Sequence, residues 1–169
     1  MHLEKMVQFF YSMDYDEVLP TETEISLFQL HARMFTLADA YDICELRHVA
    51  ADKYSAQCLT AWRPSDIFSS IHDVYVAAPP SAPRLRKIAC TAIRKKLPAL
   101  IDDKAVAKHF DQISIENPDF AKDLLRDYID NPILEHCFTC GSQQGMETLQ
   151  ARCKHCKKGQ TIYGSFSFA

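Results

Sequence analysis

The stretch EISLFQLHARMFTLADAYDICEL, residues 24–46, decides the fold class of this chain. Its apolar side chains recur at steps of three and four residues, as on one face of an α-helix; they are Leu27, Leu30, Met34, Leu37 and Tyr41. The pattern predicts a helix over 24–40, with His31 off the main apolar stripe. Asp42 is predicted to be the N-cap of a second helix, with Glu45 as its capping-box partner. The short interval between the two predicts a tight helical hairpin.

Similar patterns on both sides of this hairpin extend the helical prediction. Helices are predicted over 3–12, from Pro64, from Pro83, over 102–110 and from Pro118 to Asn131. A proline fits the first turn of a helix because its missing N–H would have no partner there. Asn117 is predicted to cap the last helix, and Asp102-Asp103 the one before it. The chain is therefore expected to be mainly α, with six or seven helices.

Length and composition set the class of protein. The chain has 169 residues, of which 47% are apolar and 24% charged, which is room for one globular domain and a small appendage. No apolar run approaches the roughly 18 residues that a membrane span needs. The first ten residues carry Glu4 and Lys5 and resemble no secretory signal, so an intracellular location, nucleus or cytoplasm, is expected.

Charge is unevenly distributed along the chain. From Cys137 onward the chain has four basic residues and one acidic residue, which gives a net charge of +3. The residues before Cys137 include 15 basic and 21 acidic ones, which gives a net charge of −6. The body is therefore not expected to bind nucleic acid. Six cations lie between residues 84 and 96 and are read as a solvated helix face, because no aromatic residues are interleaved with them for base stacking. The acidic residues of segment 13–23 are predicted to lie in solvent.

The most specific local pattern is a set of four cysteines near the C-terminus. Two C-x2-C pairs are separated by twelve residues; they are Cys137, Cys140, Cys153 and Cys156. Two such pairs can complete a tetrahedral zinc site, and four sulfur ligands leave no open position, so the expected Zn²⁺ is structural. Disulfide pairing is the next alternative, but nothing indicates an oxidising compartment. Strands flanking the pairs are expected at 147–151 and 160–163, as in a zinc ribbon.

The other three cysteines lie singly on predicted helices. Free cysteine usually behaves as a small buried hydrophobe. Cys44, Cys58 and Cys90 are therefore predicted to pack in the core. No nucleophile elbow, zinc-protease, phosphate-loop or dinucleotide motif occurs, so the chain is expected not to be an enzyme.

Several segments resemble the fungal branch of the BTB (POZ) family. The segment VQFFYSMDY, residues 7–15, is similar to a helix near the end of that domain. The segment LHARMFTLADAYDI, residues 30–43, resembles the family's next helix, and Leu46, Ala50 and Tyr54 continue like its last one. Residues 66–75 and 116–125 are similar to the helical extension that follows the domain.

This resemblance implies a domain organisation. Residues 1–60 would be the C-terminal helices of a partial BTB domain, 61–132 the helical extension and 133–169 a zinc-ribbon-like module with four cysteine ligands. Nothing in the chain resembles the strand-rich first half of the domain, where most of the family's dimer surface lies, so the resemblance leaves homodimerisation open. Apolar surface on helices 3–12 and 26–41, which those strands would cover, is expected to be exposed.

The resemblance also implies a function. BTB proteins are adaptors, so the chain is expected to bind protein partners, as a substrate adaptor for a cullin-type ubiquitin ligase or as a transcriptional scaffold. The cullin-facing surface would lie around 11–17 and 37–46, together with the helical extension. One alternative is a zinc-ribbon nucleic-acid-binding protein with the helical body as carrier, and another is a remnant without independent activity.

Overall fold

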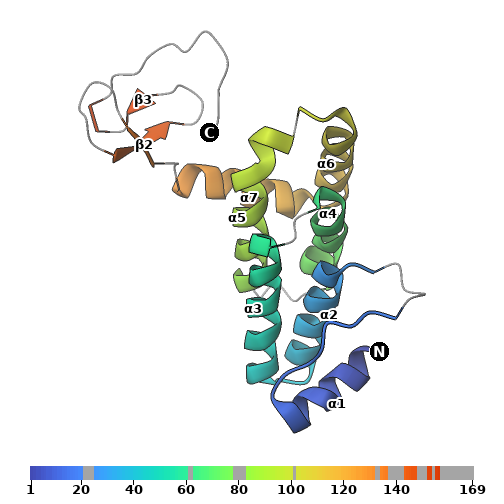
Figure 1. Ribbon diagram of the computed structural model, residues 1–169. Coiled ribbons are helices and arrows are strands. Elements are labelled where there is room, and N and C mark those ends of the chain that lie inside the picture. The colour runs from blue at the N-terminus through green and yellow to red at the C-terminus, as the bar shows by residue number, and fades with distance from the viewer. Residues whose placement is uncertain are drawn as a thin grey trace. The chain divides into compact units, whose positions relative to one another are not determined.

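The computed structural model of the protein is mainly helical, as the sequence predicts. It describes residues 1–20, 25–60, 63–77, 83–100, 102–131, 134–136, 143–147, 152–153 and 155–156. In chain order, the elements are α1 (His2–Ser12), α2 (Leu27–Ala40), α3 (Cys44–Thr60), α4 (Pro64–His72), the π-helical turn η1 (Asp73–Ala77), α5 (Pro83–Leu100), α6 (Lys104–Glu116), α7 (Pro118–Asp130), β1 (Leu134–His136), β2 (Gln143–Glu147) and β3 (Arg152–Cys153) (Figure 1).

The chain divides into two compact units, Met1–Leu124 and Leu125–Ala169. The first unit contains residues 1–60 together with most of 61–132, and the border between the units falls inside α7. Among the described residues, no helix is both long enough and apolar enough to cross a membrane.

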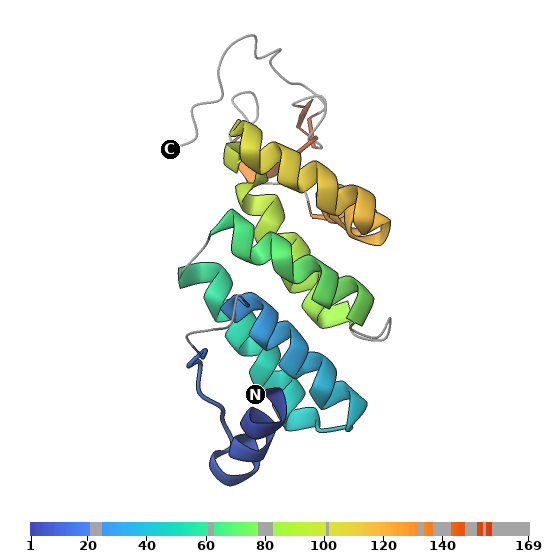
Figure 2. The same cartoon turned by 90° about the vertical axis from the view of Figure 1, so that its right-hand side faces the viewer.

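The α2–α3 hairpin lies at the centre of the first unit. The two helices pack along their length, and both figures show them side by side (Figures 1 and 2). Phe28 of α2 and Tyr54 of α3 are fully buried and meet edge to face, with ring centroids 5.2 Å apart. Leu30, Met34 and Leu46 are also fully buried in this part of the core. Helix α1, helix α4 and η1 pack against α2, so α2 is enclosed on several sides.

The predicted capping of the hairpin is wrong, and the structure shows why. Asp42 has a φ of 53°, which is the left-handed region and not the extended geometry of an N-cap. Its N–H bonds to Asp39 O (3.1 Å) and the N–H of Ile43 to Ala38 O (2.8 Å). These two bonds form a Schellman motif, so Asp42 terminates α2 and does not start α3.

The capping box occurs at the other end of α2. Ser26 Oγ accepts the backbone N–H of Gln29 (3.3 Å), and Gln29 Oε1 accepts the backbone N–H of Ser26 (3.1 Å). Helix α2 therefore begins at Leu27, three residues later than predicted, because the serine hydroxyl satisfies an otherwise unpaired donor of the first turn. Ser26 Oγ also lies within donor distance (3.2 Å) of Asp66 O in α4.

Prolines begin α4 and α5 at Pro64 and Pro83, as the sequence predicts. Asp103 caps α6 by accepting the N–H groups of Ala105 (2.8 Å) and Val106 (3.4 Å), and the helix continues to Glu116, six residues further than predicted.

The expected side-chain cap on α7 is not formed. Asn117 Nδ2 donates to Ile113 O in the preceding helix (3.1 Å), and the N–H of Phe120 bonds to the backbone carbonyl of Asn117 (3.0 Å). Asn117 is buried at the junction of the two helices, where the carbonyl of Ile113 is within reach of its amide.

A chain of aromatic contacts joins the later helices of the first unit. Phe68 of α4 contacts the rings of His109 and Phe110 at 5.3 and 6.1 Å, and Phe110 lies 6.2 Å from Phe120. Phe120 in turn lies 5.7 Å from Tyr75 of η1. Edge contacts of this kind add to the stabilisation from burial alone.

Candidate functional site

The four predicted zinc ligands lie in the second unit, and two of them are outside the described residues. Cys137 and Cys140 are not among those residues. Cys153 is the last residue of β3, and Cys156 lies in the turn that follows, half-buried beside the exposed His155. The described residues, which do not include Cys137 and Cys140, contain no group of three or more histidine, cysteine or acidic side chains that could hold a metal.

The directions of the strands in the second unit are relevant to the proposed pairing of these cysteines in one metal site. Strand β2 pairs antiparallel with both β1 and β3, with His136 opposite Gln143 and Cys153 opposite Met146. Strands β1 and β3 therefore run in the same direction, and their C-terminal ends point to the same end of the sheet. Cys137 follows β1 directly in sequence, and Cys153 ends β3. Of the strand expected at 147–151, only Glu147 is described, as the last residue of β2; residues 148–151 and the strand expected at 160–163 lie outside the described residues.

In the first unit, α1 exposes the apolar face that the sequence predicts for it. Leu3, Val7 and Phe10, at successive turns, are 57%, 50% and 58% exposed, and Tyr11 beside them is 89% exposed. The side chains that α1 buries are instead Lys5 and Phe9.

Helix α2 does not share this exposure, although the resemblance implied that it would. Half of its residues are buried, because α1, α3, α4 and η1 pack around it. Tyr41, just past its end, is 61% exposed.

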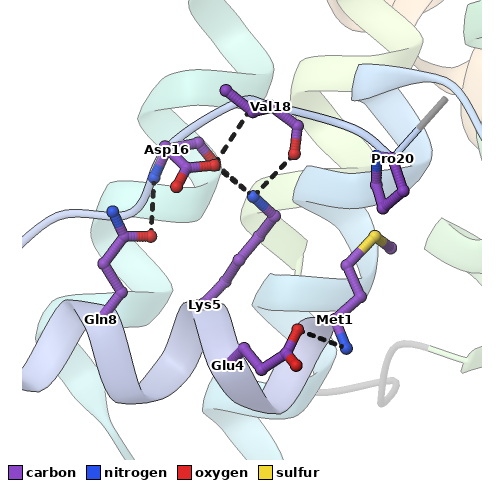
Figure 3. A pocket seen from close by; sticks show the side chains of 7 residues that line it. All are labelled: Met1, Glu4, Lys5, Gln8, Asp16, Val18 and Pro20. Atoms are coloured by element: carbon purple, nitrogen blue, oxygen red, sulfur yellow. Dashed lines mark hydrogen bonds and ion pairs between the residues drawn. The ribbon is translucent and has the colours of Figure 1, made fainter.

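A buried lysine fixes the orientation of α1. Lys5 Nζ donates to Asp16 O (2.9 Å), Asp16 Oδ1 (2.5 Å) and Val18 O (3.0 Å), which uses all three of its protons (Figure 3). Gln8 holds the same loop by accepting the N–H of Asp16 (3.1 Å). The hydrogen bond from Lys5 holds the pKa of the Asp16 carboxyl below its ordinary value.

The pocket around Lys5, of about 290 Å³, is therefore part of the attachment of α1. Figure 3 shows the lysine amine directed at the loop rather than into open space.

The loop after α1 is anchored by a second cluster. Tyr15 is buried, and its hydroxyl lies 2.8 Å from Nδ1 of the fully buried His31. Glu17 Oε1 lies 3.7 Å from His31 Nε2. Lys53 pairs with Asp14 (3.1 Å) and Glu17 (3.4 Å). These acidic residues are exposed to solvent, as predicted, and they also pair with cations on α1 and α3.

Burial sets the ionisation of this cluster. Desolvation lowers the pKa of His31 to about 4, an effect that the nearby Glu17 carboxylate only partly offsets. Burial also raises the pKa of Tyr15 far above its ordinary value. Tyr15 therefore remains a hydroxyl that can donate to the neutral imidazole. The cluster is suited to fixing the loop rather than to proton transfer with a bound substrate.

The sequence did not identify Lys5 and His31 as structural residues, although signals were present. Lys5 lies one turn before Phe9, and three acids follow the helix, of which Asp16 is the partner of Lys5. His31 belongs to a second helical stripe with Phe28, Phe35 and Ala38, and this stripe faces the core.

The cations of α5 do not form one uniform solvated face. The Arg86 guanidinium lies 4.7 Å from the centroid of the Tyr75 ring and donates to Tyr75 O (3.2 Å), and Arg94 is buried. Arg84 pairs with Asp52 of α3 at 2.5 Å.

The remaining cations line a groove of about 470 Å³ between α3 and α5. The described lining consists of Asp52, Ser55, Cys58, Leu59, Arg84, Lys87, Ile88, Thr91, Ala92, Lys95 and Lys96.

The isolated cysteines divide between core and surface. Cys58 and Cys90 are buried as predicted, whereas Cys44 is exposed at the first residue of α3. Its sulfur lies 3.1 Å from a guanidinium nitrogen of Arg47, so the prediction of packing is wrong for this residue.

No protein-family model matches the chain, and no curated protein or solved structure matches it either.

Proposed function

We propose that the chain is a protein–protein interaction module that presents the exposed face of α1 to a partner. The observation that carries this proposal is the stripe of Leu3, Val7 and Phe10, at least half exposed on three successive turns. Contiguous apolar surface of this kind is typical of docking sites, and the spacing suits a helix laid into an apolar groove of the partner.

The attachment of α1 supports this proposal. Turning the helix to bury its apolar stripe would pull Lys5 out of its contacts with Asp16 and Val18. The rotation would also leave the carbonyl oxygens of Asp16 and Val18 without their donor and bring the buried Phe9 ring to the surface. The outward orientation of the stripe is therefore maintained by specific polar contacts.

The test is recovery of partners by the tagged full-length chain from cell extract, identified by mass spectrometry. Val7→Asp/Phe10→Asp places two charges on the stripe, and we expect it to lose the partners. The control Val76→Asp/Ile115→Asp makes the same chemical change at two other exposed apolar positions, 61% and 77% exposed. Both variants are checked for the wild-type helical signal. Equal recovery by the two variants would refute the proposed surface.

The narrower function is that of an adaptor for a cullin-type ubiquitin ligase or of a transcriptional scaffold. It is supported by the resemblance of residues 7–15 and 30–43 to BTB helices. The same purification tests it, since a cullin scaffold or transcriptional subunits among the recovered proteins would identify which assembly is bound. Recovery of chaperones alone would count against both.

We further propose that Cys137, Cys140, Cys153 and Cys156 bind one structural Zn²⁺ per chain. The spacing supports this, and so does the common direction of β1 and β3, each associated with one cysteine pair. Metal analysis should find one zinc in the wild type and in Cys44→Ser, and none in Cys137→Ser/Cys140→Ser. A metal-free wild type would contradict the proposal.

Nucleic-acid binding by the tail is the second candidate, favoured by the basic residues beside the second cysteine pair, Arg152, Lys154, Lys157 and Lys158. Phosphate contacts would give an affinity for a labelled oligonucleotide that falls steeply with salt. Absence of such binding at low salt would exclude it.

A further inference from the structure

We propose that the groove between α3 and α5 binds an acidic amphipathic helix of a protein partner. This inference rests on the proposed function, because it assumes that the chain acts by binding proteins. It concerns a surface separate from the α1 stripe: the residues that line the groove come from α3 and α5, and none comes from α1.

The first argument is the charge of the groove. Its described lining includes four cations, Arg84, Lys87, Lys95 and Lys96, and one acid, Asp52. Within the described part of the chain, Lys87 and Lys95 have no acidic partner within ion-pair distance. The chain as a whole carries −3, so the groove is a local concentration of positive charge on an acidic protein. Such a surface attracts acidic partners selectively.

The second argument is the apolar character of the remaining lining. Leu59 is 83% exposed at the groove, and Ile88 and Ala92 are partly exposed on the facing side of α5. Burial raises the pKa of the Cys58 thiol to about 11, so Cys58 contributes a neutral, weakly polar surface. A partner therefore needs apolar side chains to fill the groove and carboxylates to meet its edge.

The third argument is the dimension of the groove. Its lining on α5 runs from Arg84 to Lys96, and twelve residue steps at about 1.5 Å give a length of about 18 Å. The Asp52–Arg84 pair lies at one end and Cys58 with Lys96 at the other, so α3 and α5 run in the same direction along it. Both views show the two helices side by side (Figures 1 and 2). The lining on α3 runs from Asp52 to Leu59 and spans only about 10 Å, so the two sides together accommodate about two to three turns of a helix.

A nucleic acid fits the groove less well than such a helix. The described lining contains no aromatic side chain on which a base could stack. Its aliphatic residues would also be covered by a polar phosphate backbone, which gains nothing from apolar contact.

The test uses the full-length chain and a fluorescein-labelled helical peptide of 14 residues, with leucines at i, i+4 and i+7 and glutamates on the flanking positions. A second peptide carries glutamine at every glutamate, and a 20-nucleotide single strand serves as the nucleic-acid probe. We expect the acidic peptide to bind in fluorescence anisotropy, the glutamine peptide to bind about tenfold more weakly, and the affinity for the acidic peptide to fall with added salt.

Matched variants locate the binding. Lys87→Glu/Lys95→Glu should weaken binding of the acidic peptide by about tenfold or more. Lys104→Glu/Lys108→Glu makes the same change in charge at exposed positions of α6 and should bind like wild type. Leu59→Ser tests the apolar contact without altering charge, and it should weaken binding of both peptides.

Several outcomes would overturn the inference. Equal binding of the two peptides, equal effects of the two lysine pairs, or no binding at 100 μM would each refute it. Binding of the oligonucleotide alone, lost in Lys87→Glu/Lys95→Glu, would assign the groove to nucleic acid instead. If the chain still recovers partners through the α1 stripe but fails these peptide tests, the proposed binding of a helix in the groove is refuted and the proposed function stands.

Discussion

His31 lies in an environment that is unfavourable to its charged form. The side chain is fully buried, and its Nδ1 lies 2.8 Å from the Tyr15 hydroxyl. Burial lowers its pKa from 6.5 to about 4 in the folded chain, whereas the unfolded chain retains the ordinary value. As the pH falls from 6.5 to 4, the unfolded state takes up a proton that the folded state does not. The free energy of unfolding should therefore decrease through this window.

Over this whole pH window the free energy of unfolding should fall by roughly 3 kcal/mol, and urea unfolding at several pH values can measure the decrease. In His31→Gln, whose amide can still bond the Tyr15 hydroxyl, we expect this part of the pH dependence to disappear. His48→Gln changes an exposed histidine and should keep it. Parallel pH profiles for wild type and His31→Gln would show that His31 does not titrate in this way.

Met13 occupies a strained backbone position at the end of α1. Its φ is 57°, and its N–H bonds to Phe9 O, which closes the helix. A side chain with a Cβ is disfavoured in this region, and glycine is not. Met13→Gly should raise the free energy of unfolding by about 0.5–1 kcal/mol, after allowance for the greater entropy of the unfolded chain. Val18→Gly, at an exposed position without positive φ, should lower it.

At the scale of the element, the start of α2 depends on one hydroxyl group. Ser26→Ala removes the capping box and the contact with Asp66 O, and it should lower the free energy of unfolding by about 1 kcal/mol in denaturant unfolding.

Asp42→Gly tests whether Asp42 ends α2 or caps α3. If Asp42 were an N-cap, removing its carboxylate would cost a few tenths of a kcal/mol. In the Schellman motif glycine is the preferred residue, so this variant should be at least as stable as wild type.

Helix α1 shows that an apolar stripe in the sequence does not reveal whether another part of the chain covers that stripe. The stripe of Leu3, Val7 and Phe10 has the spacing of a helix that faces a core. The side chains that α1 actually buries are Lys5 and Phe9, because the segment after the helix folds back and presents Asp16 and two carbonyl groups to the lysine. Helical periodicity gives the faces of a helix, whereas the position of the following loop decides which face is used.

At the scale of the whole molecule, the two compact units predict separable responses to metal removal. If the four cysteines hold zinc, a chelator should unfold only the second unit, Leu125–Ala169. The thermal transition of the helical unit, followed by circular dichroism at 222 nm, should keep its midpoint. Proteolysis should then cut the second unit faster, and Cys137→Ser/Cys140→Ser should behave like the chelated protein. A large shift of the helical transition would show that the two units depend on each other.

The helical class, the proline starts at Pro64 and Pro83 and the apolar stripe of α1 could be predicted from the sequence alone. These features follow from local rules, namely the period of the helix and the missing N–H of proline. The tertiary structure was needed to show that Lys5 and His31 are buried, that the apolar stripe of α1 is exposed, and that cations of α5 line a groove with α3. The physical reason is that the burial of a polar side chain and the pairing of a charge depend on groups that are distant in sequence, and spacing along one helix contains no information about them.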